Sequence, residues 1–352
     1  QNQVKMMISD VALEGLAIPG EFVTDFVFPA KASGLDVTWT SSEPAIISES
    51  GIFTAPKAET DVTLTAAVAG RTKDFAVKAL PRDIARNLIA SYDFEKDNVT
   101  EKDGDKTVRD LSGNGRDLLV KGNAKVEGTL DLSANTAAGF EKNGYAIVPA
   151  GLLTGLRSYT VSFDAVINST SGAPRIYDFG CNNGNSLFFR AAKVAAGLKL
   201  GGGTTTMVQS DKALPTKTIV QIAVTFSAGT GATTIYVDGE ELASGKNVTG
   251  EPYMLAQSLT DGRNYIGRTQ WWDTSYAKDN VDFVGTIDNF RVYNTALTPE
   301  EINFVQKGVS SVVAPVIADG AEEQLYDING RRVSGTPAPG IYIRGNEKIL
   351  IR

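Results

Sequence analysis

Short runs rich in Val, Ile, Thr, Phe and Tyr recur along most of this 352-residue chain, and clusters of Gly, Asn, Asp and Pro separate them. Side chains on a strand point alternately to its two faces, so such runs bury one face and leave the other in water. Many short strands with turn residues between them are typical of antiparallel β-sandwiches. The pattern therefore predicts an all-β protein, and the length suits two or three domains.

The amino-acid composition excludes several kinds of chemistry. The chain has no His and a single Cys, Cys181, which rules out His-dependent nucleophilic catalysis, imidazole-bound zinc and an intrachain disulfide. Any bound metal must then have oxygen ligands, as calcium and magnesium do. The net charge is −7 and the basic residues are scattered, which argues against nucleic acid as a partner. No apolar run approaches the roughly 20 residues of a membrane span, so none is predicted.

One helix is predicted, directly after the strand pattern GTIDNFRVYN that begins at Gly285. Thr298 is the expected N-cap, Pro299 occupies the first helical position, and Glu301 completes a capping box. Gly308 is placed to end this helix. Elsewhere in the chain, helical periodicity is nearly absent.

Residues 1–80 are predicted to form a first β-sandwich. The stretch LDVTWTSSEPAIISESGIFTAP starts at Leu35 and DVTLTAAVAGRTKDFAVKAL starts at Asp61, and both read as alternating strands broken by turns. Trp39 is expected to anchor the core. The pattern "TWTSS…ISESGIFTAP…VTLTA" resembles the bacterial Ig-like modules found beside glycoside hydrolase and arabinofuranosidase domains, and it carries no active site. Residues 81–87, PRDIARN, are expected to form a short linker.

Residues 88–308 are predicted to form a second, larger sandwich. Its motifs are, in order, "YDFE", "DLSGNG", "YTVSFDAVI", "IYVDG", "YIGR" and "GTIDNFRVYNTALTPEEI". In the fourth motif, Asp238 and Gly239 suit a type I′ hairpin turn. This order resembles the concanavalin A-like/laminin G-like jelly-roll family, which implies a concanavalin A-like sandwich here.

Residues 309–352 contain three short strand patterns and are expected to form a small β appendage. The pattern "YD.NGR.V…GIYI…K.LI" resembles the C-terminal β tails of secreted Bacteroidetes proteins. The resemblance implies an exported protein, located outside the cell, at the cell surface or in the periplasm.

Asp288 is the residue that does not fit the pattern GTIDNFRVYN. Strict alternation places Ile287 on one face of the strand, and Asp288, Phe290 and Val292 on the other. The carboxylate is therefore expected to face a core, where an unpaired charge is costly. A buried Arg, several backbone N–H donors or a cation can each compensate it.

The turn RDLSGNGRD, which begins at Arg109, supplies a candidate partner for that carboxylate. In the laminin G-like family the "D.SGNG" turn and the C-terminal "ID" strand lie side by side and commonly share a calcium ion. The resemblance implies that Asp110, Asn114 and Asp288 bind a structural calcium. An ion pair with Arg109 or Arg116, or hydrogen bonds alone, are the alternatives.

The loop RTQWWDTSYAKDNVDF, residues 268–283, places Trp271, Trp272 and Tyr276 among polar residues without strand alternation. Exposed aromatic rings stack on the apolar faces of sugars, so the loop is a candidate carbohydrate site. The nearby candidates for hydrogen bonds to sugar hydroxyls are Gln270, Asp273 and Asn280. The alternative is that one Trp fills the edge of the sandwich or the interface with the first domain.

Jelly-roll glucanases of this superfamily carry an E-x-D-x-x-E strand motif that directs two carboxylates into one groove. The motif does not occur in this chain, so hydrolysis is not expected. The expected function is exported, non-catalytic carbohydrate binding in a polysaccharide-utilisation system, with a glycan as the partner and a glycoside hydrolase as a further candidate. Two alternatives stay open: a glycoside hydrolase or an accessory fragment of one, and a protein-adhesion or structural module.

Overall fold

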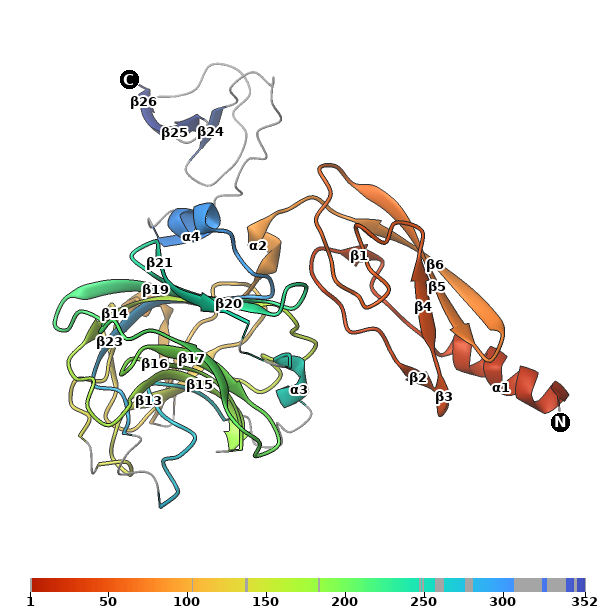
Figure 1. Cartoon of the computed structure of the whole chain (residues 1–352). Coiled ribbons are helices and arrows are strands. Elements are labelled where there is room, and N and C mark those ends of the chain that lie inside the picture. The colour runs from red at the N-terminus through yellow and green to blue at the C-terminus, as the bar shows by residue number, and fades with distance from the viewer. Residues whose placement is uncertain are drawn as a thin grey trace.

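The computed structural model describes residues 2–102, 104–136, 139–182, 184–246, 248, 250–256, 263–275 and 281–306, and the strands 325–327, 340–344 and 347–351. The all-β prediction is confirmed, because β-sheets dominate these residues and the helices are few and short. Figure 1 shows a narrow N-terminal unit beside a two-layered sandwich. Within the described residues, no helix has both the length and the apolar character to cross a membrane.

The N-terminal unit is built on one four-stranded sheet. Its elements are the helix α1 (Asn2–Glu14), the strands β1 (Glu21–Phe22), β6 (Arg71–Ala79), β5 (Thr60–Val68) and β4 (Thr38–Ser41) in sheet order, and the small hairpin of β2 (Lys31–Ala32) and β3 (Leu35–Asp36). Trp39 on β4 is 7% exposed and stacks on Phe28 with 4.6 Å between ring centroids. Its indole N–H donates to the carbonyl of Pro29 at 3.0 Å. Trp39 is thus a core residue of this unit, as predicted.

The helix α1 was not predicted, because its apolar residues do not form a single stripe. Ala12 and Leu13 are buried against the sheet, whereas Met7 and Val11 are 69% and 62% exposed. Lys73 on β6 donates from Nζ to carbonyl oxygens in and just after the last turn of α1, including that of Leu13 at 2.9 Å. The helix therefore depends on the neighbouring sheet, and a weak periodicity in its own sequence does not reveal it.

The larger unit consists of two sheets that enclose one core. The nine-stranded sheet contains, in order, β18 (Thr206–Gln209), β17 (Ala195–Lys199), β16 (Asn185–Arg190), β15 (Arg175–Asn182), β22 (Arg263–Ile266), β13 (Tyr145–Val148), β10 (Leu118–Lys121), β9 (Asp105–Val108) and β8 (Val99–Lys102). The eight-stranded sheet contains β11 (Lys125–Val126), β12 (Leu130–Asp131), β23 (Gly285–Tyr293), β14 (Tyr159–Ile167), β19 (Ile219–Ser227), β20 (Ala232–Val237) and β21 (Glu240–Gly245), with β7 (Leu88–Tyr92) paired to β23.

Aromatic rings from both sheets meet in the centre of this sandwich. Phe163 on β14 and Phe290 on β23 stack with 5.6 Å between their centroids. Tyr177 on β15 and Phe189 on β16 pack against Phe163 at 6.2 and 5.9 Å. All four side chains are almost completely buried, so burial of these rings contributes strongly to the stability of the sandwich.

The remaining elements are α2 (Ile84–Asn87), the 3₁₀ helix η1 (Lys96–Asn98), α3 (Tyr253–Ala256), α4 (Pro299–Gln306), and a separate sheet of β24 (Leu325–Asp327), β25 (Gly340–Arg344) and β26 (Glu347–Ile351). The predicted hairpin turn is confirmed, since Asp238 and Gly239 connect β20 to β21 with φ of 53° and 83°. The predicted capping box is also confirmed. Thr298 N–H donates to Glu301 at 2.9 Å and Glu301 N–H donates to Thr298 Oγ1 at 3.3 Å. Gly308 lies outside the described residues.

We expect Thr298→Ala to lower the free energy of unfolding by about 1 kcal/mol, the usual cost of losing a helix cap. The substitution removes the hydroxyl that accepts the Glu301 N–H. Urea unfolding followed by circular dichroism measures this change. Pro299→Ala is the control, since Pro at the first helical position donates no hydrogen bond and its loss should have a smaller effect. Equal effects of the two substitutions would contradict a capping role for Thr298.

The strand β23 does not alternate strictly, which corrects the prediction for Asp288. Asn289 has φ of 50°, and the pairing with β14 shifts register at this point, so the strand contains a bulge. Ile287 and Phe290 are therefore both in the core, whereas Asp288 is only half-buried. The predicted shared face of Asp288, Phe290 and Val292 is wrong, because one extra residue changes the face of every side chain before it.

Candidate functional site

Helices cover part of the outer side of the eight-stranded sheet. Ile302 and Val305 of α4, together with Ile84 of α2, form a buried cluster with Tyr236 and Tyr293 of that sheet. Figure 1 shows α4 lying over β19 and β21. The opposite surface of the sandwich, on the nine-stranded sheet, is therefore the broader candidate for binding.

Strand alternation identifies the side chains on that surface. Tyr177, Phe179, Leu187 and Phe189 point into the core, so their neighbours in sequence point away from it. We call this surface the outer face, and it carries Asp178, Ser186, Phe188, Arg190, Lys199 and Tyr265. Arg175 also lies on the outer face, because it pairs with Arg190 across the strands and its guanidinium stacks on Phe188 at 3.9 Å.

A buried ion pair lies at the centre of the outer face. Arg175 donates from Nη1 to Asp178 Oδ2 at 2.6 Å, and the exposed fractions of the two side chains are 10% and 0%. Burial raises the pKa of Asp178, and the charge of Arg175 opposes that effect. The carboxylate also accepts the backbone N–H of Gln270 at 2.8 Å. Asp178 thus fixes the predicted aromatic loop to the sheet.

Gln270 is a structural residue, which corrects its prediction as a sugar-binding side chain. It is fully buried, and its side-chain amide donates to the carbonyls of Asp178 at 2.9 Å and Arg263 at 2.5 Å. Asp178 is far from Gln270 in sequence, and a turn separates Arg263 from Gln270. The sequence alone therefore gave no sign that this polar side chain is enclosed.

A second buried ion pair holds the other end of the loop. Arg268 and Asp282 are 3.0 Å apart and almost fully buried. The Arg268 guanidinium lies 3.8 Å from the ring centroid of Tyr145 and 5.0 Å from that of Trp272. Trp272 therefore packs over the ion pair, which agrees with the alternative that one Trp fills the edge of the sandwich.

Trp271 and Asp273 remain at the surface of the loop. Trp271 is half-buried, and Lys199 Nζ lies 4.8 Å from its ring centroid. Asp273 is exposed and pairs with Arg263 Nη1 at 3.0 Å. An aromatic ring is thus placed beside charged hydrogen-bonding groups on the outer face. Tyr276 and Asn280, the other two predicted binding residues, lie outside the described residues.

Three carboxylates around the described part of this loop are paired. Asp178, Asp273 and Asp282 are bound to Arg175, Arg263 and Arg268, respectively. Glycosidases need one carboxyl group to donate a proton and another to act as a base or nucleophile. An acid held against a guanidinium is poorly suited to either role, so the geometry favours binding over hydrolysis.

Two of the three predicted calcium ligands, Asp110 and Asn114, have hydrogen-bond partners within the protein. Asp110 accepts four hydrogen bonds, from Ser91 N–H, Ser112 N–H, the Ser112 hydroxyl and Arg116 N–H, at 2.8 to 3.0 Å. Asn114 donates to the carbonyl of Leu88 at 3.1 Å.

Asp288 lies instead beside other acidic groups. It pairs with Asp164 across the sheet, and Asn289 donates to both carboxylates. Burial, together with the charges of Asp164 and Glu95, raises the pKa of Asp288 to about 6. Among the described residues, no group of three or more acidic side chains is arranged to hold a metal. Calcium binding by Asp110, Asn114 and Asp288 stays an untested prediction.

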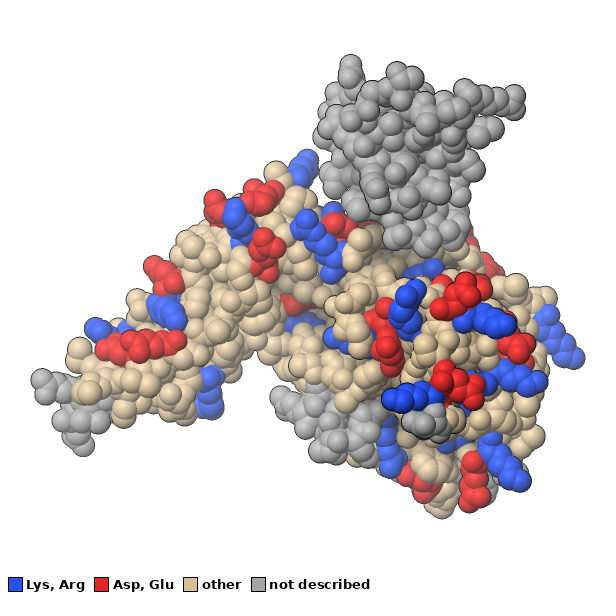
Figure 2. Space-filling view, turned by 180° about the vertical axis from the view of Figure 1, so that it is seen from behind, with Lys and Arg blue, Asp and Glu red and all other residues tan. Residues whose placement is uncertain are grey.

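Charge is mixed over the remaining surface. On the side of the molecule seen in Figure 2, Lys and Arg lie among Asp and Glu over the sandwich and the N-terminal unit. Recognition on that side would therefore not rely on an extended patch of one sign.

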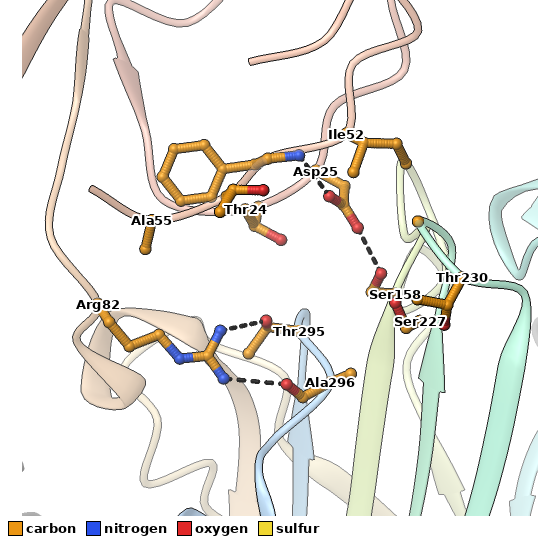
Figure 3. Close-up of a pocket in the computed structure, with 13 residues that line it drawn as sticks. Thr24, Asp25, Ile52, Ala55, Arg82, Ser158, Ser227, Thr230, Thr295 and Ala296 are labelled. Carbon is orange, nitrogen blue, oxygen red and sulfur yellow. Dashed lines mark hydrogen bonds between the residues drawn. The ribbon is translucent and has the colours of Figure 1, made fainter. Parts of the chain in front are cut away.

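A cavity of about 350 Å³ lies where the N-terminal unit meets the sandwich (Figure 3). Asp25 accepts the N–H of Phe53 at 2.7 Å and the hydroxyl of Ser158. Arg82 donates to Thr295 Oγ1 at 2.8 Å and to the carbonyl of Ala296 at 3.0 Å, and it also pairs with Glu301. The charged groups of this cavity have protein partners, so we assign them to the junction between the two units.

Comparisons with known proteins agree with this architecture. Residues 140–303 match the model of the concanavalin A-like lectin/glucanases superfamily, and residues 23–81 match that of the atrophied bacterial Ig domain. No curated protein sequence matches the chain.

Several solved structures are similar to this chain at low sequence identity. Domain 4 of AbnA, a GH43 extracellular arabinanase from Geobacillus stearothermophilus solved with arabinotriose, is 20% identical with a TM-score of 0.43, over 62% of this chain and 98% of that one. The binding domain of botulinum neurotoxin serotype C1 is 16% identical with a TM-score of 0.44, over 63% of this chain and 52% of that one. This chain thus spans about half the length of the toxin domain.

The single four-stranded sheet of the N-terminal unit suits an Ig domain that has lost strands, and the two facing sheets suit a jelly roll. In sequence and in architecture, residues 23–81 thus resemble an atrophied bacterial Ig domain, and residues 140–303 resemble the concanavalin A-like lectin/glucanases superfamily.

Proposed function

We propose that this protein is a non-catalytic carbohydrate-binding protein, exported as part of a polysaccharide-utilisation system, and that it binds glycans on the outer face around Trp271. The observation that supports this site most directly is the half-buried ring of Trp271 with Lys199 at 4.8 Å. A sugar ring can stack on an indole while its hydroxyls bond to neighbouring charged groups. Asp273 and Arg263 supply an acceptor and donors beside the ring.

The contacts that anchor Arg268, Gln270 and Asp282 to the sandwich also support this proposal. The two buried ion pairs and the amide of Gln270 hold Trp271 in place before any ligand arrives. Binding to a preformed surface avoids the entropic cost of ordering a loop. Hydrolysis is the second candidate, and the ion pairs of Asp178, Asp273 and Asp282 argue against it.

We expect Trp271→Ala to weaken glycan binding by about ten-fold or more, the usual effect of removing a central aromatic contact. A glycan array identifies the ligand, and isothermal titration then measures its affinity for both proteins. Ile219→Ala is the matched control, because Ile219 is a large apolar side chain on β19 of the other sheet and is 72% exposed.

Three results would contradict the proposal. Binding that survives in Trp271→Ala would remove the site from the outer face. A protein that binds none of the plant and host polysaccharides on the array is not a glycan-binding module for those sugars. Release of reducing ends from the same polysaccharides would show an enzyme instead.

A further inference from the structure

We propose that the outer face selects glycans that carry an oxyanion, a carboxylate or a sulfate, and that Arg190 is the residue that recognises it. This inference rests on the proposed carbohydrate site, because Arg190 lies on the same face as Trp271. It adds the chemical class of the ligand, which Trp271 alone does not determine.

The strand register brings two guanidinium groups together. Arg175 on β15 is the cross-strand partner of Arg190 on β16, and Arg190 is in turn the partner of Ala195 on β17. Cross-strand partners in an antiparallel pair point to the same face with their Cβ atoms about 5 Å apart. Ala195 has a short side chain without an acceptor, and its own partner on β18, Gln209, is a neutral amide, so the row offers no carboxylate on that side of Arg190.

Only one of the two guanidinium groups has a carboxylate partner. Arg175 binds Asp178 at 2.6 Å, and its Nη1 also lies 3.4 Å from the Ser186 hydroxyl. Arg190 forms no ion pair with the described residues and donates one hydrogen bond, to the carbonyl of Lys193 at 3.3 Å. The Nε atoms of Arg175 and Arg190 are both buried, and neither has a hydrogen-bond partner among the described residues.

The charges around Arg190 therefore do not balance. Arg175, Arg190 and Lys199 are three cations on the outer face, and Asp178 is the single acid bonded to any of them within the described residues. The exposed turn after β18 adds one acid and one base, Asp211 and Lys212, which leaves the balance unchanged.

An unpaired cation in this position is unfavourable in the protein alone. Burial and the charge of Arg175 lower the pKa of Arg190, which means that its charged form is destabilised there. Ionisable groups with perturbed pKa values cluster at functional sites, where a ligand can supply the missing opposite charge. The guanidinium of Arg is a planar fork of donors that matches the two oxygens of a carboxylate or sulfate.

The path from Arg190 to the aromatic ring is continuous along the outer face. Arg190 is beside Arg175, Arg175 contacts Ser186, Ser186 is the cross-strand partner of Lys199, and Lys199 lies over Trp271. One sugar unit stacked on Trp271 and an acidic unit at Arg190 thus belong to the same oligosaccharide. Lys199 lies between them and provides a further positive charge.

The test compares polymers that differ only in charge. Polygalacturonate and its fully methyl-esterified form share one backbone, and dextran sulfate and dextran share another. We expect the wild-type protein to bind a charged member at least about ten-fold more tightly than its neutral counterpart, as charge-assisted hydrogen bonds require. Preference within the first pair assigns a carboxylate, and preference within the second assigns a sulfate.

Arg190→Met should remove this preference and leave the affinity for the neutral polymer unchanged. Arg190→Lys keeps the charge but loses the fork, and we expect it to retain only part of the preference. Lys96→Met is the matched control, because Lys96 is an exposed cation in η1, next to β8 at the opposite edge of the nine-stranded sheet. A thermal melt of each variant checks folding, and Arg190→Met should be at least as stable as wild type.

The outcomes separate this inference from the proposed function. Equal binding of charged and neutral polymers, still lost in Trp271→Ala, overturns the oxyanion site and leaves the carbohydrate site standing. Equal weakening by Arg190→Met and Lys96→Met assigns the preference to overall charge and also overturns it. Absence of binding to all four polymers, and to every glycan on the array, overturns both proposals.

Discussion

Replacing Arg268 with Met is expected to lower the free energy of unfolding by about 3–5 kcal/mol, the usual cost of removing one partner of a buried ion pair. The substitution leaves the carboxylate of Asp282, which is 1% exposed, without its guanidinium. Asn143 donates to the same carboxylate at 3.1 Å, but an amide N–H does not neutralise the charge. Urea unfolding of the wild type and the variant measures the difference.

The deficit of Arg268→Met should decrease as the pH falls. Burial raises the pKa of Asp282 above its ordinary value even with Arg268 present, and loss of the cation raises it further. A carboxyl whose pKa is raised by folding takes up a proton more readily in the folded state, so the folded variant gains stability at acidic pH. A deficit independent of pH would show that lost packing on Tyr145, and not the unpaired charge, is the cause.

Two further variants serve as controls for the ion pair. Arg263→Met breaks the pair with Asp273, whose side chains are 25% and 36% exposed, and should cost no more than about 1 kcal/mol. Arg268→Met combined with Asp282→Asn removes both charges and should recover part of the loss. If Arg263→Met is as harmful as Arg268→Met, burial is not what distinguishes the two pairs.

Asp288→Asn is expected to stabilise the metal-free protein at pH 7.5 and to have little effect near pH 4. The pKa of this carboxyl is about 6 in the folded protein against an ordinary 3.8, so ionisation at neutral pH weakens the fold. A shift of this size corresponds to about 3 kcal/mol, and we expect about 1.5 kcal/mol because the side chain is only half-buried. The asparagine keeps an oxygen that can accept the Asn289 N–H.

The measurement is a pair of denaturant titrations in EDTA at the two pH values. The stability of the wild type should fall more than that of the variant as the pH rises from about 4 through about 6, because only the wild type contains the Asp288 carboxyl. Two parallel pH profiles would contradict the raised pKa.

The same proteins test the calcium predicted from the sequence. Calcium bound to the folded state raises the melting temperature by mass action. A rise in the wild type that is lost in Asp288→Asn and in Asp110→Asn would support the three predicted ligands as a set. A rise lost only in Asp288→Asn would place the ion among the acids around β23, and no rise in the wild type would exclude it.

Features that depend on neighbouring residues could be predicted from the sequence. The capping box at Thr298 and the hairpin turn at Asp238 each involve residues within a few positions, and the structure contains both. The fold followed from many such local patterns taken in order. The burial of Gln270 and the packing of Trp272 on Arg268 could not be predicted in this way, because their partners include residues distant in sequence or depend on how the loop folds back.

Strand alternation does not predict the orientation of a side chain correctly where the strand contains a bulge. One bulge at Asn289 reverses the expected orientation of Asp288. Two further bulges lie between Arg175 and Asn182 on β15. Without them, the register set by the pair of Asn182 and Asn185 would place Tyr177 opposite Arg190. The bulges instead bring Arg175 there, so the neighbouring guanidinium groups are a product of tertiary structure that the spacing of residues conceals.

Glu301 has a mechanical consequence for the whole molecule. Its carboxylate accepts the N–H of Thr298 at the start of α4, and it also pairs with Arg82, which leads from the Ig domain, at 2.7 Å. Glu301 thus has two roles: it caps α4, and it binds the segment between the domains to the jelly roll. Tension applied to the Ig-like domain therefore passes through Arg82 and Glu301 into α4 and the adjoining β23.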